Sequence, residues 1–231
     1  MRAKTATRAK RAAKPRATLT RDRVLRAAIS LADRDGIESL SMRNLGGKLG
    51  VKAMSLYNHV RNKEDMLDGM IDVIFSEIDL PPSGVDWRTA MRQRAISAHR
   101  VLLRHPWANG LMESRTSPGP ANLRHHDAVL GSLRGAGFSV EVAARAYSIL
   151  DSYVYGFTLT ESTLPFSNSE EAKEVAGNLL EGFRPGEYPH LAEMAVDRAM
   201  KPGYSYGDEF DYGLDLILDG ILRARSDDTK R

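Results

Sequence analysis

The chain of 231 residues contains no cysteine. This absence excludes a disulfide framework, a thiolate metal site and a cysteine nucleophile, and it suits a reducing cytoplasm. Long apolar runs are missing as well. None approaches the roughly 18 residues of a membrane-spanning helix, and the N-terminus lacks the apolar segment of a secretory signal. We therefore expect a cytoplasmic protein without a membrane partner.

Catalytic and metal-binding signatures are also scarce. We expect no G-x-S-x-G nucleophile elbow, no P-loop and no H-E-x-x-H zinc motif, and the acidic residues are dispersed along predicted helix surfaces. The neighbours His125 and His126 would point about 100° apart on a helix, so they are poorly placed to share a metal. We predict no catalytic residue, no metal site and no cofactor.

Charge is distributed very unevenly along the chain. Residues 1–63 contain 16 Lys/Arg against 4 Asp/Glu, a net charge of +12, whereas residues 64–231 contain 17 against 26, a net charge of −9. The modest total of +3 therefore combines a basic head with an acidic body. A basic head of this kind indicates a polyanionic partner, and double-stranded DNA is the obvious candidate.

The first 19 residues form the most basic part of the head. They contain seven Lys/Arg and no acidic residue, which predicts a disordered basic arm. The arm is either a solvated tail or a segment that adds phosphate contacts or enters the minor groove. A transit peptide is a third reading, which the scarcity of apolar residues before Leu19 disfavours.

Capping residues, apolar periodicity and Pro/Gly breaks predict an all-α fold without strands or internal repeats. Expected N-caps are Thr20, Ser41, Asn62, Asp86 and Ser139. The predicted helices span 20–35, 41–49, 52–59, 62–79, 86–105, 107–114, 118–134, 139–164, 189–200 and 207–225. Residues 165–188 are predicted to form a mobile loop with a helical piece. The predicted domains are a helix-turn-helix unit over 20–66 and a larger helical part over 67–225, followed by a tail over 226–231.

Residues 41–63 carry the helix-turn-helix pattern. Gly50 supplies the permissive backbone for a sharp turn between two short helices. The inner positions Leu45, Leu49, Leu56 and Val60 are predicted to be core. The second short helix would then turn its small and polar face toward a major groove about 12 Å wide.

The outward residues of this segment are predicted to contact DNA. Arg43 is the best candidate for a bidentate contact to guanine O6/N7. Ala53 and Met54 are placed to touch thymine methyls, and Tyr57 either contacts a base edge or sugar or simply packs. Lys63 adds its ammonium to the free N–H groups of a helix start, which predicts a phosphate clamp. The full predicted set is Arg43, Lys52, Ala53, Met54, Ser55, Tyr57, Asn58, His59 and Lys63.

Two C-terminal helices have more apolar surface than one core requires. Residues 146–159 are apolar on nearly all sides, which is typical of a helix buried on more than one face. Phe210, Leu214, Ile217 and Ile221 form one stripe of the last helix. Gly213 and Gly220 lie on an adjacent strip, where another backbone could approach closely.

The chain resembles the TetR family of bacterial transcriptional regulators. The similarity is close over Leu19 to Leu67, in GIESLSMRNLGGKLGV and SLYNHVRNKEDMLD. In weaker form, RPGEYPHL and EFDYGLDLILDGIL look like the closing segments of the family's regulatory domain. The resemblance implies a homodimer formed by the helices 139–164 and 207–225. It also implies a ligand cavity in each regulatory core, and DNA contacts at the positions named above.

The resemblance predicts a ligand-responsive, nucleoid-associated repressor that binds a palindromic operator and is released by a small molecule. The pocket candidates on the middle helices are His99, Leu103, Trp107, Glu113, His126, Tyr147, Asp151 and Tyr155. Asp151 lies in an apolar helix, where a buried charge needs a partner. It could pair across the dimer interface, face the cavity or reach water. Glu113 and Asp79 stand where tetracycline-binding members have histidines, which disfavours a magnesium–tetracycline ligand.

Two other function classes are compatible with parts of the sequence. An architectural DNA-binding protein would explain the basic head, but it has no need of the long acidic and apolar body. An α-helical enzyme has the least support. A discrete footprint on DNA would favour a regulator, diffuse coverage would favour packaging, and substrate turnover without DNA binding would favour an enzyme.

Overall fold

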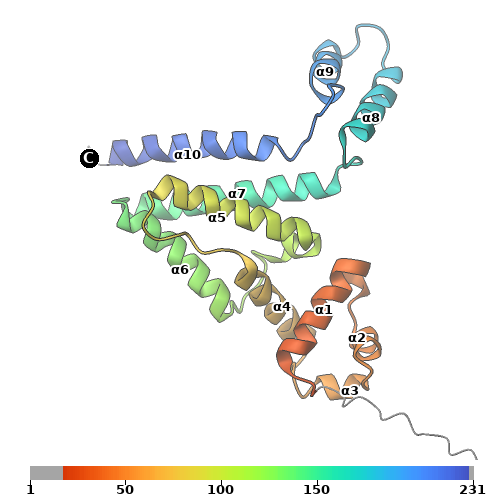
Figure 1. Ribbon diagram of the computed structural model, residues 1–231, viewed down its shortest axis with the longest axis vertical. Coiled ribbons are helices and arrows are strands. Elements are labelled where there is room, and N and C mark those ends of the chain that lie inside the picture. Colours follow the sequence, from red (N-terminus) through yellow and green to blue (C-terminus); the bar gives the residue numbers. More distant parts are fainter. Residues whose placement is uncertain (1–17, 229–231) are drawn as a thin grey trace, which may run out of the picture.

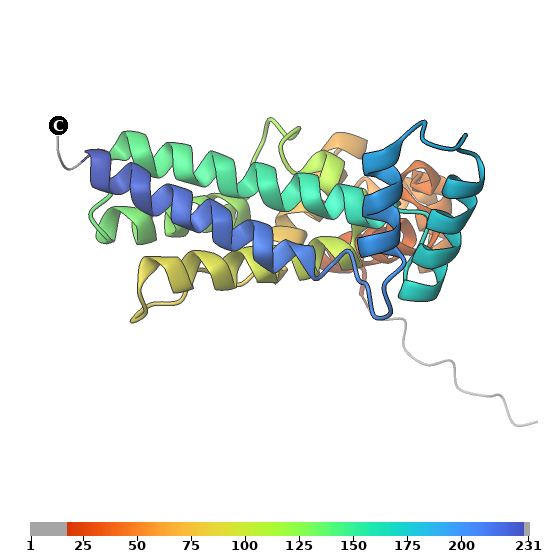
Figure 2. The ribbon, with the colours of Figure 1, turned by 90° about the horizontal axis from the view of Figure 1, so that it is seen from above.

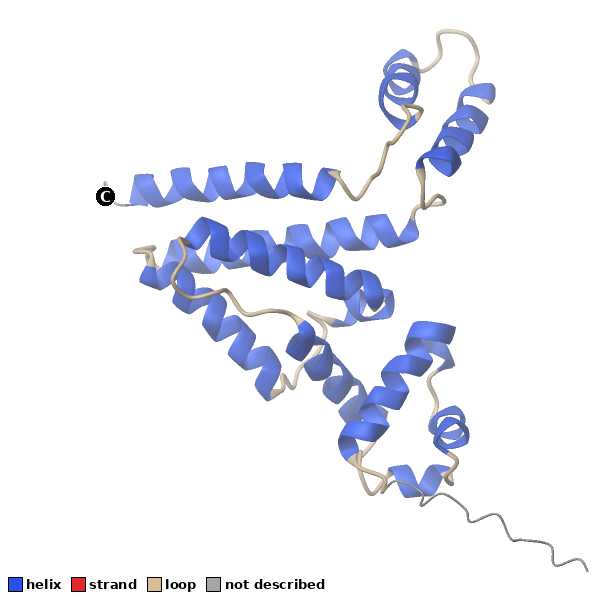
Figure 3. Cartoon of the chain, viewed as in Figure 1, coloured by secondary structure: helices blue, strands red, loops and turns tan. Residues whose placement is uncertain are grey.

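The computed structural model describes residues 18–228, in which every regular element is helical (Figure 3). The predicted basic arm lies almost entirely outside this range, as do residues 229–231 of the predicted tail. The α-helices labelled in Figure 1 are α1 (Arg21–Asp35), α2 (Met42–Leu49), α3 (Ala53–Leu56), α4 (Lys63–Glu77), α5 (Trp87–Arg104), α6 (Pro120–Gly135), α7 (Val140–Thr163), α8 (Ser169–Glu181), α9 (Pro189–Met194) and α10 (Glu209–Asp228). Shorter turns are the 3-10 helices η1 (Ile37–Ser39) and η2 (Pro106–Leu111) and the π-helix η3 (Ala195–Ala199).

The predicted helix starts are set by local side-chain caps. Each cap side chain accepts a hydrogen bond from the backbone N–H three residues further on, which satisfies a donor that the helix itself leaves free. The caps confirmed in this way are Thr20, Ser41, Asn62, Asp86 and Ser139. These starts therefore depend on residues that are close together in the chain.

Several predicted helix boundaries were wrong. The last helix, predicted over 207–225, spans Glu209–Asp228, so it includes the first three residues of the predicted tail over 226–231. The helix predicted over 52–59 ends at Leu56, and a turn follows in which His59 and Val60 donate their N–H groups to the carbonyl of Leu56. The helix predicted from Pro118 begins at Pro120 instead. Asp72 of α4 accepts hydrogen bonds from the first free N–H groups of α6, so this start is fixed by another helix.

The predicted loop over 165–188 contains the whole of α8. Asn168 caps this 13-residue helix, and Glu170 and Glu171 lie in its first turn, where negative charge suits the helix dipole. In Figure 1, α8 and α9 project from the rest of the protein beyond the end of α7. Several large apolar side chains of this arm are at least one-third exposed: Leu179, Tyr188, Leu191, Met194 and Val196.

The helices α1 to α3 and the first turns of α4 form a small head. Its core includes Val24, Leu45, Leu56, Val60 and Met66, all of which are at most 1% exposed. The predicted boundary between residues 66 and 67 falls inside α4, which continues without a break into the body. A rotation of this helix therefore moves the head relative to the body.

The body is a layered bundle of α5, α6, α7 and α10. Figure 2 shows α7 and α10 running side by side, and the two helices pack against each other. Arg88 and Arg92 of α5 form ion pairs with carboxylates one turn apart on α10, namely Asp211, Asp215 and Asp219. These pairs hold one edge of α10 against α5. No helix between residues 18 and 228 is both long and apolar enough to cross a membrane.

Candidate DNA-binding face and regulatory core

The turn between α2 and α3 depends on two glycines. Gly50 is left-handed, with φ 67° and ψ 32°, as its predicted role requires. Gly46 was not singled out from the sequence. A Cβ atom at this position would lie 2.9 Å from the carbonyl oxygen of Val51 and 3.2 Å from the amide nitrogen of Ala53. Gly46 therefore allows the two short helices to approach closely.

Most residues predicted to contact DNA lie on one accessible segment. Met54 is 74% exposed and Tyr57 is 45% exposed. Arg43, Lys52, Asn58 and Lys63 are also exposed, whereas Ala53, Ser55 and His59 are half-buried. The fold thus presents the expected side chains to a partner, and the individual DNA contacts remain predictions.

Asp65 fixes the position of this segment through hydrogen bonds. Sequence reasoning did not identify this residue. Its carboxylate accepts hydrogen bonds from Arg21 Nη1 at 2.9 Å and from the backbone N–H of Arg61 at 2.8 Å. Arg21 also donates to the carbonyl of His59 at 2.9 Å. The hydrogen bond from Arg21, together with those from Arg61, lowers the pKa of Asp65 to about 2. A single carboxylate therefore joins the start of α1 to the turn before α4.

A buried ion pair lies at the centre of the body. Arg94 of α5 and Asp151 of α7 are 1% and 4% exposed, and their side chains are directly paired. Burial opposes the charge of Arg94, but Asp151 holds the pKa of its guanidinium above the ordinary value. Asp151 was expected to pair across the dimer interface, to face the cavity or to reach water. Its burial excludes the last of these, and its ion-pair partner is an arginine of the same chain, which sequence reasoning did not single out.

Aromatic and imidazole groups surround this ion pair. Tyr155 donates to Asp151 Oδ2 at 3.3 Å, and the hydroxyl of Tyr147 lies 2.7 Å from His126 Nε2. Burial and the charge of Asp151 raise the pKa of both tyrosines, so their hydroxyls stay protonated. Burial and Asp151 also raise the pKa of Glu113, on the loop after η2. The fold therefore gathers five of the predicted pocket residues around Arg94.

Several buried polar atoms of this region have no hydrogen-bond partner. They include Arg94 Nη2, His125 Nδ1, Asn109 Oδ1 and Asn122 Oδ1. Arg94 Nε donates to His125 Nε2 at 2.8 Å, so the neutral imidazole carries its hydrogen on Nδ1. Burial and the Arg94 charge lower the pKa of His125 to about 3, which keeps the ring neutral. These donors and acceptors give the core polar groups that a ligand can satisfy.

The other three predicted pocket residues lie apart from this cluster. His99 stacks on Phe210 of α10, with ring centroids 4.1 Å apart, and its Nε2 lies 2.6 Å from Glu161. Leu103 is 36% exposed. Trp107 donates its indole N–H to Asp33 of α1 at 2.6 Å, so it lies where the body meets the head.

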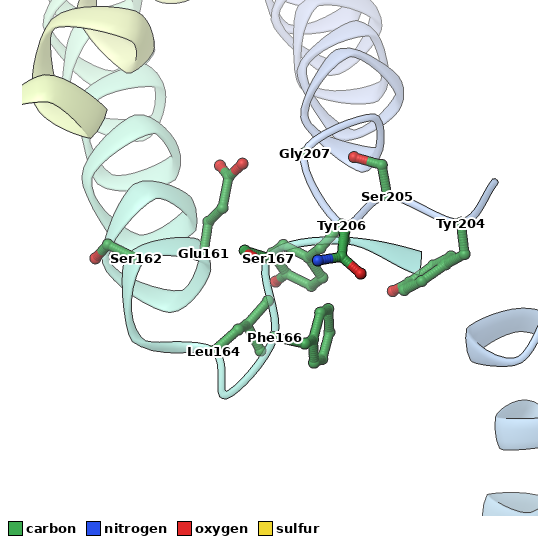
Figure 4. A pocket seen from close by; sticks show the side chains of 10 residues that line it. Glu161, Ser162, Leu164, Phe166, Ser167, Tyr204, Ser205, Tyr206 and Gly207 are labelled. Carbon is green, nitrogen blue, oxygen red and sulfur yellow. The ribbon is translucent and has the colours of Figure 1, made fainter. Parts of the chain in front are cut away.

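A hollow lies where α7 ends and α10 begins (Figure 4). It has a volume of about 270 Å³, and Glu161, Phe166, Tyr204 and Ser205 are among its lining residues. Residues 203–207, GYSYG, match the G-x-S-x-G spacing of serine hydrolases, which the sequence-based expectation of no enzyme overlooked. The match lies in a loop that precedes a helix, without the strand of a nucleophile elbow. Within residues 18–228, no hydrogen bond joins Ser205 to an imidazole.

The loop after η2 and the start of α6 hold one face of α4. Arg115 pairs with Glu64 at 2.6 Å and with Asp68 at 3.0 Å. One turn further along α4, Asp72 accepts from the backbone N–H groups of Ala121 and Asn122 at 2.8 and 2.9 Å. These three acidic residues of α4 are spaced four apart. They connect the helix that carries Lys63 to the segment that carries Glu113 and Asn122.

The helices α7 and α10 also share an uncovered apolar strip. Ile149 and Leu159 of α7 are 50% and 51% exposed, and Tyr212 and Leu216 of α10 are 67% and 54% exposed. This strip is the predicted dimer surface. The role expected for Gly213 needs correction, because a Cβ atom there would lie 2.3 Å from the hydroxyl of Tyr153, a side chain of the same subunit.

Comparison with protein-family models gives two matches that together cover most of the chain. The model of the tetracyclin repressor-like C-terminal domain matches residues 80–225. The N-terminal model, described as bacterial regulatory proteins of the tetR family, matches residues 24–70. The second match contains the helix-turn-helix, and the first contains the buried cluster and the uncovered strip.

Curated relatives match over most of their own length. An HTH-type transcriptional regulator of Saccharopolyspora erythraea is 35% identical over 205 residues, covering 88% of this chain and 84% of the relative. The HTH-type transcriptional repressor DrrR1 of Streptomyces coeruleorubidus is 32% identical over 216 residues, covering 90% and 78%. Among solved structures, ActR of Streptomyces coelicolor in complex with actinorhodin has a TM-score of 0.73 and 26% identity, covering 90% and 99%.

Proposed function

Because the chain belongs to the TetR family of bacterial regulatory proteins, and is thus a ligand-responsive DNA-binding transcriptional regulator, we propose that two copies form a repressor that binds a palindromic operator. The observation that supports this proposal is the accessible face over residues 52–63, which follows the left-handed Gly50 in the chain. Two such faces in a dimer would enter successive major grooves about 34–36 Å apart. The uncovered strip of α7 and α10 supports pairing through these helices.

The proposed effector site is the cluster around Arg94. Its unpartnered donors and acceptors suit an organic molecule that bears carbonyl and hydroxyl groups. Because Asp151 already neutralises Arg94, the site favours a ligand without strong charge. Actinorhodin is bound by the structural relative ActR, so it is the first compound to test here. An effector shifts the regulator only if it binds two conformers with different affinity, and α4 is the proposed moving element.

The test of operator binding begins with selection of duplexes from a random pool by the full chain, followed by footprinting. We expect two protected half-sites, with centres one helical turn apart. About eight phosphate contacts per dimer predict a slope of log K against log salt near −7. A slope flatter than about −3, or diffuse protection along the DNA, would favour the architectural alternative.

The roles of two side chains can be separated on the selected duplex. Replacing Arg43→Ala should cost on the order of 1–3 kcal/mol and blur the preference at one base position. Replacing Lys63→Ala should weaken binding to all duplexes alike. His190→Gln is a suitable control, since this exposed residue lies on the projecting arm. The reverse pattern for Arg43 and Lys63 would contradict the role assignment.

A further inference from the structure

The head touches the body directly at the last turn of α1, apart from their connection through α4. Asp33 of α1 accepts a hydrogen bond from His105 Nδ1 at 2.7 Å, and its Oδ1 also accepts from Trp107 Nε1 at 2.6 Å. His105 is the residue that caps the end of α5, and Trp107 lies in η2. One carboxylate of the head therefore receives two donors from the body.

The position of Asp33 within α1 is unfavourable by itself. Negative charge near the C-terminal end of a helix opposes the helix dipole. Asp33 lies two residues before the end of α1, and Asp35 follows at the last position. Asp35 is compensated locally by Arg34, with which it forms an ion pair. Asp33 is compensated from across the domain boundary, so its place in α1 makes sense as an interdomain contact.

The other nitrogen of His105 faces a second carboxylate. His105 Nε2 lies 3.3 Å from Glu77 Oε2 at the end of α4, and Arg104 donates to the same oxygen at 2.9 Å. Partial burial opposes ionisation of Glu77, but the hydrogen bonds from Arg104 and His105 outweigh it and lower the pKa of the carboxyl. His105 itself is only 8% exposed. The imidazole is thus enclosed between α1 and α4.

We propose that Asp33, His105 and Glu77 form a proton-dependent clasp that holds the head in one orientation on the body, so that DNA affinity depends on the charge of His105. Ionised carboxylates only accept hydrogen bonds, and both ring nitrogens donate only in the imidazolium form. The neutral ring keeps one of these donors and loses the other. The charged groups that face the ring are Asp33, Glu77 and Arg104.

The clasp matters for DNA because it acts on α1 and α4, the two helices that flank the helix-turn-helix segment in the chain. Asp33 fixes the end of α1, and Glu77 fixes the end of α4. Two heads held in one orientation lose less freedom on binding a palindrome than two mobile heads. This inference depends on the proposed function. It adds control of DNA affinity by pH. It also adds a second route by which a change at η2 reaches the head, through Asp33 and not along α4.

The test follows the indole N–H of Trp107 by NMR as the pH rises from about 5.5 to 8.5, the range in which histidine titrates. The chain has only two tryptophans, so the signal is readily assigned. We expect it to shift with pH in the wild type and in the control His190→Gln, but not in His105→Gln. In Glu77→Gln the midpoint should move to lower pH, because a charge that stabilises the imidazolium is gone. A simple loss of packing would not move the midpoint in this way.

DNA affinity is then measured over the same pH range on the selected duplex. We expect wild-type affinity to fall at least about fivefold more than that of His105→Gln as the pH rises. His59 on the DNA face is present in both proteins, so its titration cancels in this comparison. Equal pH dependence in both proteins, or wild-type affinity that rises with pH, would overturn the proposal. If no duplex is bound at any pH, the proposed function fails, and the Trp107 titration still tests the clasp.

Discussion

Arg94 and Asp151 lie deep in the body, with 1% and 4% of their surfaces exposed. Removing either charge from water is costly, so each depends on the other and on nearby polar groups such as His125 and Tyr155. A buried ion pair is weak evidence for stability, because two apolar side chains of similar volume often stabilise the fold equally well. Its value lies in placing polar groups inside an otherwise apolar core.

Neutralising one member of this pair should therefore strongly lower the stability of the protein. We expect Asp151→Asn to lower the free energy of unfolding by about 3–5 kcal/mol, because Arg94 is left buried without its counterion. The double variant Arg94→Met with Asp151→Leu should recover most of this loss. Urea unfolding followed by circular dichroism measures both proteins. A double variant no more stable than the single one would contradict this account of the pair.

Asp65 makes the head sensitive to acid. Its pKa is lowered to about 2 by Arg21 and Arg61, so its contribution to stability is present above the ordinary carboxyl pKa. The contribution is lost as the pH falls toward 2, where the folded state also takes up the proton. We expect Asp65→Asn to cost on the order of 1 kcal/mol at neutral pH, after allowance for solvent screening.

Measurements of wild type and Asp65→Asn across the acid range test this prediction. The difference in free energy of unfolding between the two proteins should shrink below about pH 4, because the carboxyl of the unfolded wild-type chain then takes up a proton, whereas the folded state does so only near pH 2. Asp22→Asn is a matched control, since this exposed aspartate forms an ion pair with Arg26 on the surface of the head. A difference between wild type and Asp65→Asn that stays constant with pH would mean that charge is not the cause.

At the scale of elements, the short helices of the head depend on close backbone packing, because they are too short to be stable by themselves. The helix α3 has four residues and is too short to be stable alone. Its orientation depends on Leu56 in the core and on the close approach of α2 at Gly46. Any side chain at Gly46 would meet backbone atoms, which cannot move aside without shifting the turn.

The two adjacent glycines of α2 provide a matched test. We expect Gly46→Ala to lower DNA affinity by about tenfold or more, since α3 must shift to relieve the contact with Val51 and Ala53. A Cβ atom at Gly47 meets nothing within 4 Å, so Gly47→Ala should keep affinity and stabilise the helix by about 0.5–1 kcal/mol. Binding to the selected duplex and thermal unfolding report the two effects. Equal affinity of the two variants would contradict this role of Gly46.

At the scale of the whole molecule, the uncovered strip of α7 and α10 calls for a partner. Ion pairs from Arg88 and Arg92 fix one edge of α10, and this leaves Tyr212 and Leu216 on a different, exposed face. Large apolar side chains that are exposed on two neighbouring helices typically mark an interface. A second copy of the chain would cover the strip and place two basic heads on one side.

A charge placed in the strip should prevent pairing. We expect Leu216→Glu to be a monomer at micromolar concentration and to lose operator binding, while its helix content is unchanged. Leu123→Glu is a matched control, because this leucine is 55% exposed on α6 and lies away from the strip. Sedimentation velocity measures the assembly state of both. A dimeric Leu216→Glu protein would place the interface elsewhere.

Local features were predictable from the sequence because their physical cause is local. Ser41 and Asn62 cap helices that begin at the next residue. Gly50 adopts the left-handed conformation of the turn that lies three residues before α3. The periodicity of Leu45 and Leu56 identified the core of the head in the same way. The charge step and the family resemblance added the function class, but neither identified which side chains meet inside the body.

Only the tertiary structure decided the contacts between distant parts of the chain. Asp151 finds Arg94 57 residues away, Asp72 caps a helix that begins 48 residues later, and Asp33 meets His105 72 residues away. An arginine on the inner face of α5 was a usable signal for the first contact. The other two had none, since a charged residue on a helix surface looks the same in sequence whether water or another helix faces it. That choice depends on how the helices pack, which is a property of the whole chain.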